Sequence, residues 1–261
     1  MNKNSLGDRM KKYEAVSKTE LVSRMPVVLR VDGKSFHTLT RGFEKPFDDV
    51  LIEAMQKTMK YLCENVQNCE FGYMQSDEIT LVLVDYKALN TSSFFNNEVQ
   101  KICSIVASMT TMAFNKLFAK CVDEYELDAT NYYGTLLTSA EQRIEHYKKA
   151  IEKGAMFDCR CFNVPKEDVA NVVYWRQLDA MRNSVQMVGQ SIWSHEFLQG
   201  KSCEDIKGLL RANKTPWEEY PTYCQRGSAC YKNKFGWMID KQMPVLKDNW
   251  DYIKQYIYVG D

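Results

Sequence analysis

The sequence predicts an α+β fold in which helices cover one face of an antiparallel sheet. Two observations support this prediction. Short, β-branched apolar segments alternate with longer segments whose apolar residues recur at helical spacing. Two of the short segments are joined by a tight polar turn, so the order strand, helix, hairpin, helix, strand is the one expected of this fold class.

The first predicted strand is the apolar segment at residues 26–31, which ends at Asp32 and Gly33. Glycine permits a sharp turn there because it has no side chain to restrict the backbone. A helix is predicted next. Asp48 suits its N-cap, and apolar residues recur at helical spacing over residues 50–62.

A hairpin is predicted from residues 71–75 and 79–84, with the Ser-Asp-Glu segment 76–78 at its turn. Both arms are apolar and rich in strand-forming residues. We expect the hairpin to pair beside the first strand. This pairing would bring the acidic turn close to Asp32.

The remaining elements are predicted from the same patterns. They are helices over about 97–118 and 139–153, a strand at 157–164, and a mostly helical stretch from 165 to about 193. The helix at 139–153 is rich in charge and is predicted to be solvated. The last third of the chain mixes aromatic and charged residues, and no elements are assigned to it.

Composition places the chain among globular proteins, with 45% apolar and 26% charged residues. No apolar run approaches the roughly 20 residues of a membrane helix, so no membrane partner is expected. The polar N-terminus is unlike a secretory signal, which predicts a cytoplasmic location and leaves an organelle open. Lysine plus arginine and aspartate plus glutamate both number 34, so an RNA partner requires a local positive surface.

Nine cysteines occur at irregular positions. An odd number without an export signal indicates reduced thiols. The closest metal-like spacings are Cys159-x-Cys161 and the interval from Cys63 to Cys69, and neither is the C-x-x-C pattern of a zinc knuckle. We therefore expect these cysteines to be core and strand residues.

Two carboxylates are expected to converge, because Asp32 closes the first strand and Asp77 lies at the tip of the hairpin. Mg²⁺ prefers oxygen ligands and is usually bound by one or two carboxylates plus substrate phosphates. The Gly33 carbonyl is a candidate further ligand. Glu78 is a third candidate carboxylate, although neighbouring strand residues point to opposite faces. From the residues alone, the alternative that these are solvated turn residues stays open.

Longer motifs surround these carboxylates. They are Arg30-Val-Asp-Gly-Lys-Ser-Phe-His37, Lys45-Pro46, Gln75-Ser-Asp-Glu78, Phe157-Asp-x-Arg160, Trp175-Arg-Gln-x-Asp179 and Tyr223-x-x-Arg226-Gly227. Together they closely resemble the tRNA-histidine guanylyltransferase family of reverse, 3′-to-5′ polymerases. The resemblance spans residues from about 7 to 227, and no motif covers the chain from 233 onward.

The resemblance implies a sheet similar to the palm of polymerases, within one catalytic unit of residues 1–261. The palm-like catalytic core would occupy about 1–135. Residues from about 136 to 261 would continue the sheet and add a helical C-terminal extension that serves as an RNA-binding arm. Members of the family resemble one another in forming tetramers, so a homotetramer is expected.

The resemblance also implies metal-dependent addition of nucleotides to the 5′ end of tRNA. ATP or GTP activates a 5′-monophosphate, and the 3′-OH of an incoming nucleotide then displaces the activating group. Two Mg²⁺ ions would be held by Asp32, Gly33 and Asp77, with Glu78 at the same catalytic centre. The implied nucleotide-binding residues are Arg30, Lys34, Ser35, Phe36, His37, Lys45, Ser76 and Lys101, and the implied RNA-binding residues are Arg176, Arg182 and Asn183.

The chain departs from the branch of the family devoted to histidine tRNA. That branch has a segment led by histidine after its Trp-Arg-Gln motif, where this chain has Met181 followed by Arg182 and Asn183. A thioether donates no hydrogen bond, so reading of histidine tRNA is not expected. The match is closer to the guanylyltransferase-like branch, which repairs truncated tRNA 5′ ends by copying the opposite strand.

Other functions stay open. The chain could be a strict tRNA-histidine guanylyltransferase, another palm-type enzyme such as a nucleotide cyclase, or a non-catalytic RNA-binding protein. Single residues have structural alternatives as well. Arg30 could form a structural ion pair, Lys101 could lie on a solvated helix face, and His37 could belong to the core.

Overall fold

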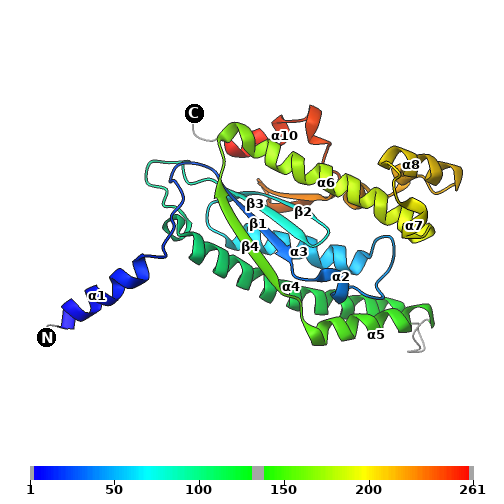
Figure 1. The fold of residues 1–261 in the computed structure, drawn as a ribbon, viewed down its shortest axis with the longest axis horizontal. Helices are drawn as coiled ribbons and strands as arrows, with labels where there is room; N and C mark the ends of the chain where they lie inside the picture. The colour runs from blue at the N-terminus through cyan, green and yellow to red at the C-terminus, as the bar shows by residue number, and fades with distance from the viewer. Residues whose placement is uncertain (1–2, 131–137, 259–261) are drawn as a thin grey trace.

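The computed structural model describes residues 3–130 and 138–258 (Figure 1). The helices are α1 (Lys3–Ala15), α2 (Phe36–Leu39), α3 (Asp49–Asn65), α4 (Val99–Ala129), α5 (Thr138–Lys153), α6 (Lys166–Ile192), α7 (His195–Leu198), α8 (Cys203–Ala212), α9 (Thr222–Arg226) and α10 (Asp251–Ile257). The strands are β1 (Val27–Gly33), β2 (Cys69–Gln75), β3 (Glu78–Leu83), β4 (Phe157–Asn163), β5 (Ser228–Asn233) and β6 (Gly236–Asp240). Short 3₁₀ helices lie at Phe94–Asn97, Trp217–Glu219 and Leu246–Asp248.

The sheet is antiparallel, with strand order β4-β1-β3-β2-β5-β6. Asp32, near the end of β1, is paired with Glu78 of β3 on one side and with Asp158 of β4 on the other. The β2–β3 turn therefore lies beside the end of β1, as the hairpin prediction required. The α+β fold class is confirmed.

One face of the sheet packs on α3 and α4. α3 begins as predicted, because the carboxylate of Asp48 accepts a hydrogen bond from the Leu51 amide at 3.0 Å. α4 continues past its predicted end near residue 118, since Cys121 and Val122 extend its buried stripe. By length and composition alone α4 could cross a membrane, but this stripe packs against α3 and β4.

The other face of the sheet packs on α6 and α10, which belong to the predicted helical C-terminal extension (Figure 1). Val28, Phe71 and Val82 of the strands meet Val173 of α6 and Ile253 of α10 in this second core cluster. Helices therefore cover both faces, where the sequence predicted coverage of one. This explains the nearly continuous apolar runs of β1 and β3, since strands buried on both faces do not alternate.

Helix α5 is only partly solvated, which corrects its prediction. Ile144, Tyr147 and Ala150 are buried along one side, while the charged residues occupy the other. Tyr147 packs edge-to-face against Phe43 and Phe118. The apolar spacing was present in the sequence but was hidden among charges.

The C-terminal third completes the sheet. β5 pairs with β2, and β6 forms the outer strand beside it. The helices α7 and α8 pack against the second half of α6 through Val185, Val188 and Ile206. The predicted division near residue 135 falls at 131–137, outside the described residues, and β4 from beyond it pairs directly with β1.

Candidate active site

The predicted metal ligands meet at one end of the sheet. Asp32 and Gly33 end β1, and the two-residue turn between β2 and β3 is made of Ser76 and Asp77. Ser76 has a φ of 51°, in the left-handed region that side chains rarely adopt. Gly33 is required because a Cβ there would lie 2.3 Å from the ring of Phe36.

The two aspartates are close enough to repel one another. The pKa of Asp77 is raised, chiefly by burial and further by the Asp32 carboxylate, while hydrogen bonds and His37 act in the opposite direction. In the described part of the chain, no lysine or arginine forms an ion pair with either aspartate. The site therefore combines negative charges that a bound cation would neutralise.

Glu78 is placed differently from its neighbour Asp77. Its carboxylate accepts a hydrogen bond from Nε of Arg176 at 2.6 Å, and both residues are less than a tenth exposed. Nη2 of Arg176 also donates to Asp179 at 3.0 Å. This buried network argues against two predicted roles, Glu78 as a catalytic carboxylate and Arg176 as an RNA contact, because both groups are already paired away from solvent.

A polar cavity of about 440 Å³ opens beside Gly33 and Asp77, and Asp32 is not among the residues that line it. Its lining includes the predicted residues Gly33, Ser35, Phe36, His37, Lys45, Ser76 and Asp77. His37 and Lys45 are exposed, so their side chains are available to an anionic ligand. Phe36 is buried against Phe114 and Phe157, with ring centroids 5.5 and 5.1 Å away, and its ring belongs to the core.

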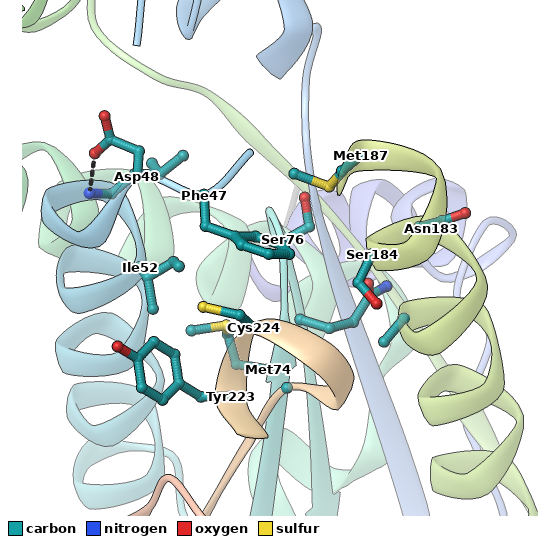
Figure 2. A pocket seen from close by; sticks show the side chains of 14 residues that line it. Phe47, Asp48, Ile52, Met74, Ser76, Asn183, Ser184, Met187, Tyr223 and Cys224 are labelled. Atoms are coloured by element: carbon teal, nitrogen blue, oxygen red, sulfur yellow. Dashed lines mark hydrogen bonds between the residues drawn. The ribbon is translucent and has the colours of Figure 1, made fainter. Parts of the chain in front are cut away.

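A second, mostly apolar cavity of about 220 Å³ adjoins the first (Figure 2). The two share the lining residues Asp48, Leu51, Ser76 and Met187. The other lining residues are Phe47, Ile52, Met74, Gln75, Ala180, Asn183, Ser184, Tyr223, Cys224 and Gly227. α3, the β2–β3 hairpin, α6 and α9 thus all contribute to one continuous site.

Other predicted basic residues lie outside the lining of these cavities. Lys34 is exposed at the start of the loop after β1. The guanidinium of Arg30 lies 5.7 Å from the ring centroid of Trp175, and Nζ of Lys101 lies 5.0 Å from that of Phe95. No structural ion pair involves Arg30 among the described residues, which argues against that alternative.

The predicted RNA contacts on α6 are dispersed. Arg182 is exposed and forms an ion pair with Asp179, one turn back on the helix. Asn183 lines the apolar cavity, and its amide donates to Asp179 at 3.5 Å. Met181 packs partly buried against the cluster formed by α6 and α8, so its side chain is directed away from solvent.

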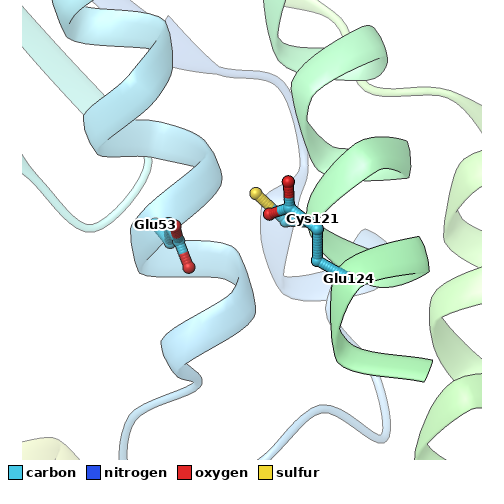
Figure 3. A group of neighbouring side chains, drawn as sticks. All are labelled: Glu53, Cys121 and Glu124. Carbon is cyan, nitrogen blue, oxygen red and sulfur yellow. The ribbon is translucent and has the colours of Figure 1, made fainter. Parts of the chain in front are cut away.

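Another group of possible metal donors lies between α3 and α4. The donor atoms of Glu53, Cys121 and Glu124 are within 4.8 Å of one another (Figure 3). However, Nζ of Lys57 lies 3.0 Å from the Glu53 carboxylate and 3.1 Å from that of Glu124. The lysine ammonium bridges the two carboxylates, so the group is an ion-pair network.

Sequence comparison decides the family. The family model described as tRNAHis guanylyltransferase matches residues 7–165. This chain belongs to the tRNAHis guanylyltransferase family. It is therefore a nucleotidyltransferase, as the motifs around Asp32 and Asp77 predicted.

Relatives of this family member match most of its length. An uncharacterized protein of Acanthamoeba polyphaga mimivirus is 29% identical over 94% of this chain and 79% of that protein. A probable tRNA(His) guanylyltransferase of Dictyostelium discoideum is 26% identical over 77% of this chain and 69% of that protein.

Solved structures agree with the fold. A bacterial tRNA(His) guanylyltransferase-like protein in complex with ATP has a TM-score of 0.82 and 36% identity, covering 97% of this chain and 100% of that one. Such a protein in complex with GTP has a TM-score of 0.78 and 34% identity, covering 98% and 100%.

Sequence reasoning missed the apolar cavity of this guanylyltransferase family member. Phe47, Met74 and Met187 come from separate elements, and each fits an ordinary core pattern. One signal was available, since the motif at Tyr223 and Gly227 lies on the cavity wall. That motif was singled out in the sequence without a role.

Proposed function

We propose that this chain is a Mg²⁺-dependent nucleotidyltransferase that extends tRNA at its 5′ end, in the 3′-to-5′ direction. The observation that carries the proposal is the pair Asp32 and Asp77, which interact at the end of the sheet where Asp77 lines a cavity of nucleotide size. Among the described residues, neither aspartate forms an ion pair with a lysine or arginine. Family membership supports the reaction class. The names of the relatives support tRNA as substrate, and their ATP and GTP complexes support a triphosphate site.

The residues at the end of β1 and at the hairpin turn fit Mg²⁺. Asp32, Asp77 and the Gly33 carbonyl offer only oxygen donors, and these are the ligands that Mg²⁺ prefers. When bound, two such ions would stabilise the attacking and leaving oxygens of phosphoryl transfer. Glu78 is left out of this ligand set because Arg176 already holds its carboxylate.

The two adjoining cavities suit the two parts of a nucleoside triphosphate. The apolar cavity, between Phe47, Ile52 and Met74, suits a flat base. The polar cavity places His37 and Lys45 near the aspartates, where they would position a triphosphate through its negative charge. Ser76, which lines both cavities, would lie where the sugar joins base to phosphates.

We further propose that the incoming nucleotide is selected by pairing with the opposite strand of the acceptor stem. Met181 carries no hydrogen-bond donor and packs inward on α6. The exposed residues around it, Arg182 and Asn183, suit contacts to the RNA backbone rather than the reading of one tRNA. Repair of 5′-truncated tRNA follows from such a site.

The direct test uses a tRNA that lacks its first nucleotide and carries a labelled 5′-phosphate. Each nucleoside triphosphate is added in turn, with Mg²⁺ or with a chelator. We expect a 5′-adenylylated or 5′-guanylylated intermediate and then addition of one nucleotide, both only with Mg²⁺. Extension at the 3′ end, formation of a cyclic nucleotide, or RNA binding without turnover would each contradict the proposal.

A further inference from the structure

Three cysteines from two elements gather at the edge of the sheet. Cys103 lies near the start of α4, and Cys159 and Cys161 lie two residues apart on β4, so both point to the α4 side. The sulfur atoms of Cys103 and Cys161 are 3.5 Å apart and share a hydrogen bond. All three thiols are half-buried, which leaves them within reach of small solutes.

The cluster favours one thiolate between two protonated thiols. The pKa of Cys103 is lowered to about 6, first by its side-chain hydrogen bond with Cys159 and then by its hydrogen bond with Cys161. Burial and the Asp158 carboxylate act against this shift. Burial and the neighbouring Cys103 raise the pKa of Cys161 to about 12. A thiolate is the nucleophilic form of cysteine, so the reactive position is Cys103.

We propose that these three cysteines form a peroxide-reactive thiol site, in which Cys103 is oxidised and Cys161 converts the product to an intramolecular disulfide. The Cys103 thiolate attacks one oxygen of hydrogen peroxide and the O–O bond breaks. Hydroxide is released, and Cys103 becomes a sulfenic acid. The Cys161 sulfur then attacks the Cys103 sulfur and the S–O bond breaks. The leaving hydroxide takes the Cys161 proton and becomes water. The hydroxide of the first step takes up the proton that Cys103 lost on ionisation, so two thiols and one peroxide give one disulfide and two waters.

The geometry assigns the partners. A disulfide has an S–S length of about 2.05 Å, so Cys103 and Cys161 must approach by only about 1.5 Å. Cys159 and Cys161 point the same way from one strand and therefore do not face each other. Cys103 is consequently the common partner, with Cys159 as its second neighbour. The proposal does not depend on the nucleotidyltransferase site.

The first experiment treats the reduced full chain with hydrogen peroxide, removes the peroxide with catalase, alkylates the free thiols and maps the peptides by mass spectrometry. We expect a Cys103–Cys161 disulfide as the main product, reversed by dithiothreitol. Cys161→Ser should give a Cys103–Cys159 disulfide, and Cys103→Ser should give neither. Cys103 remaining reduced, or disulfides that exclude it, would overturn the proposal.

The second experiment needs no variant and therefore does not depend on how a substitution folds. The wild-type chain is alkylated with iodoacetamide at pH 6, and the rate is measured at Cys103 and at Cys203, an equally half-buried cysteine on α8. The pKa of Cys103 is lowered to about 6, so its larger thiolate fraction should outweigh its lower nucleophilicity, and we expect it to react about tenfold faster than Cys203. Equal rates at the two positions would refute the reactive role of Cys103.

Discussion

Asp32, Asp77 and Glu78 lie at the same end of the sheet but differ in whether a cationic side chain neutralises them. Glu78 is buried and paired with Arg176, whereas Asp32 and Asp77 are half-buried and form no ion pair with a lysine or arginine in the part of the chain that the structure describes. Residues adjacent in the sequence thus differ in role because Glu78 is in β3 and Asp77 is in the turn. This difference makes the metal assignment testable one residue at a time.

Replacement of Asp77 by Asn is expected to abolish activity and to stabilise the protein in the absence of Mg²⁺. The pKa of Asp77 is raised in the folded chain, so its charged form costs stability at neutral pH, and an amide removes that cost. Loss of a ligand in the reaction centre should lower turnover at least about 100-fold.

The measurements are the 5′-addition assay and thermal melting with and without Mg²⁺. Mg²⁺ should raise the melting temperature of the wild type but not of Asp77→Asn. Asp123→Asn, an exposed change on α4, is the control and should alter neither quantity. Near-normal turnover of Asp77→Asn at saturating Mg²⁺ would show that the metal assignment is wrong.

Arg176 and Arg182 are expected to differ in their effects on stability. Arg176→Ala leaves Glu78 buried without a partner and should lower the free energy of unfolding by about 3 kcal/mol. Arg182→Ala removes an exposed ion pair and should change it by less than about 1 kcal/mol. Denaturant unfolding compares the two, and equal losses would mean that the buried pair contributes no more than the exposed one.

At residue scale, the sequence predicted that Asp32 and Asp77 lie at the same end of the sheet, because a strand end and a hairpin turn follow local rules. It grouped Arg176 with Arg182 and did not predict the buried pairing of Arg176 with Glu78. Both side chains pair with Asp179, but Arg176 is buried and also pairs with Glu78 of β3. That contact joins residues far apart in the chain, so the helical spacing of α6 does not indicate it.

At the scale of elements, local patterns sufficed for β1, the β2–β3 hairpin, α3 and α6. They failed for β5, which gains its place by pairing with β2, more than 150 residues earlier in the chain. The apolar cavity was not predicted from the sequence for the same reason, because α3, α6 and α9 form it together. Contacts between residues so far apart in the chain leave no periodic signal in the sequence.

Gly227, between α9 and β5, tests how closely these elements must approach. It has a φ of +85°, and a Cβ there would lie 2.4 Å from the carbonyl oxygen of Met74. Gly227→Ala should therefore cost about 1–3 kcal/mol of stability and weaken triphosphate binding at the cavity that it lines. The matched control is Gly208→Ala on α8, where a Cβ meets nothing within 4 Å and a stabilisation of about 0.5–1 kcal/mol is expected.

Chemical denaturation and titration with ATP measure the two effects of Gly227→Ala. If this variant is as stable as the wild type and binds ATP equally well, α9 does not form a tight wall of the nucleotide site. If Gly208→Ala lowers stability as much as Gly227→Ala does, the loss comes from replacing glycine by alanine in general and not from the close approach of Gly227 to Met74.

At the scale of the whole molecule, the proposed site joins both halves of the chain. The β2–β3 hairpin and α3 supply one wall, and α6 and α9 supply the other. A chain with no net charge can hold RNA only through local positive surfaces, and an oligomer could combine several of them around one tRNA. The family resemblance predicts a homotetramer.

Helix α1 offers a way to test that assembly. It projects from the body, and Leu6, Met10, Tyr13 and Val16 are exposed on it or just after it (Figure 1). Light scattering should give about four times the 30.4 kDa of one chain. Deletion of residues 1–17 should reduce the number of chains in the assembly if the apolar side chains pack on another copy. A monomeric full chain would contradict the prediction.

The last prediction concerns which RNA the whole enzyme accepts. A protein that selects histidine tRNA must hydrogen-bond particular bases, and the wrong tRNA is rejected because it leaves those groups unpaired. Met181 cannot take that role, since it carries no donor and packs against the α6–α8 cluster.

We expect addition to several tRNAs that lack a 5′ nucleotide, with each added nucleotide complementary to the opposing base. The assay compares truncated tRNAs matched except for the anticodon or for the opposing base. Rates should vary by less than about tenfold with the anticodon, because no base-reading contact worth about 1.4 kcal/mol is lost. Guanosine added whatever the opposing base, or activity confined to the histidine anticodon, would mean that the enzyme reads histidine tRNA through other residues.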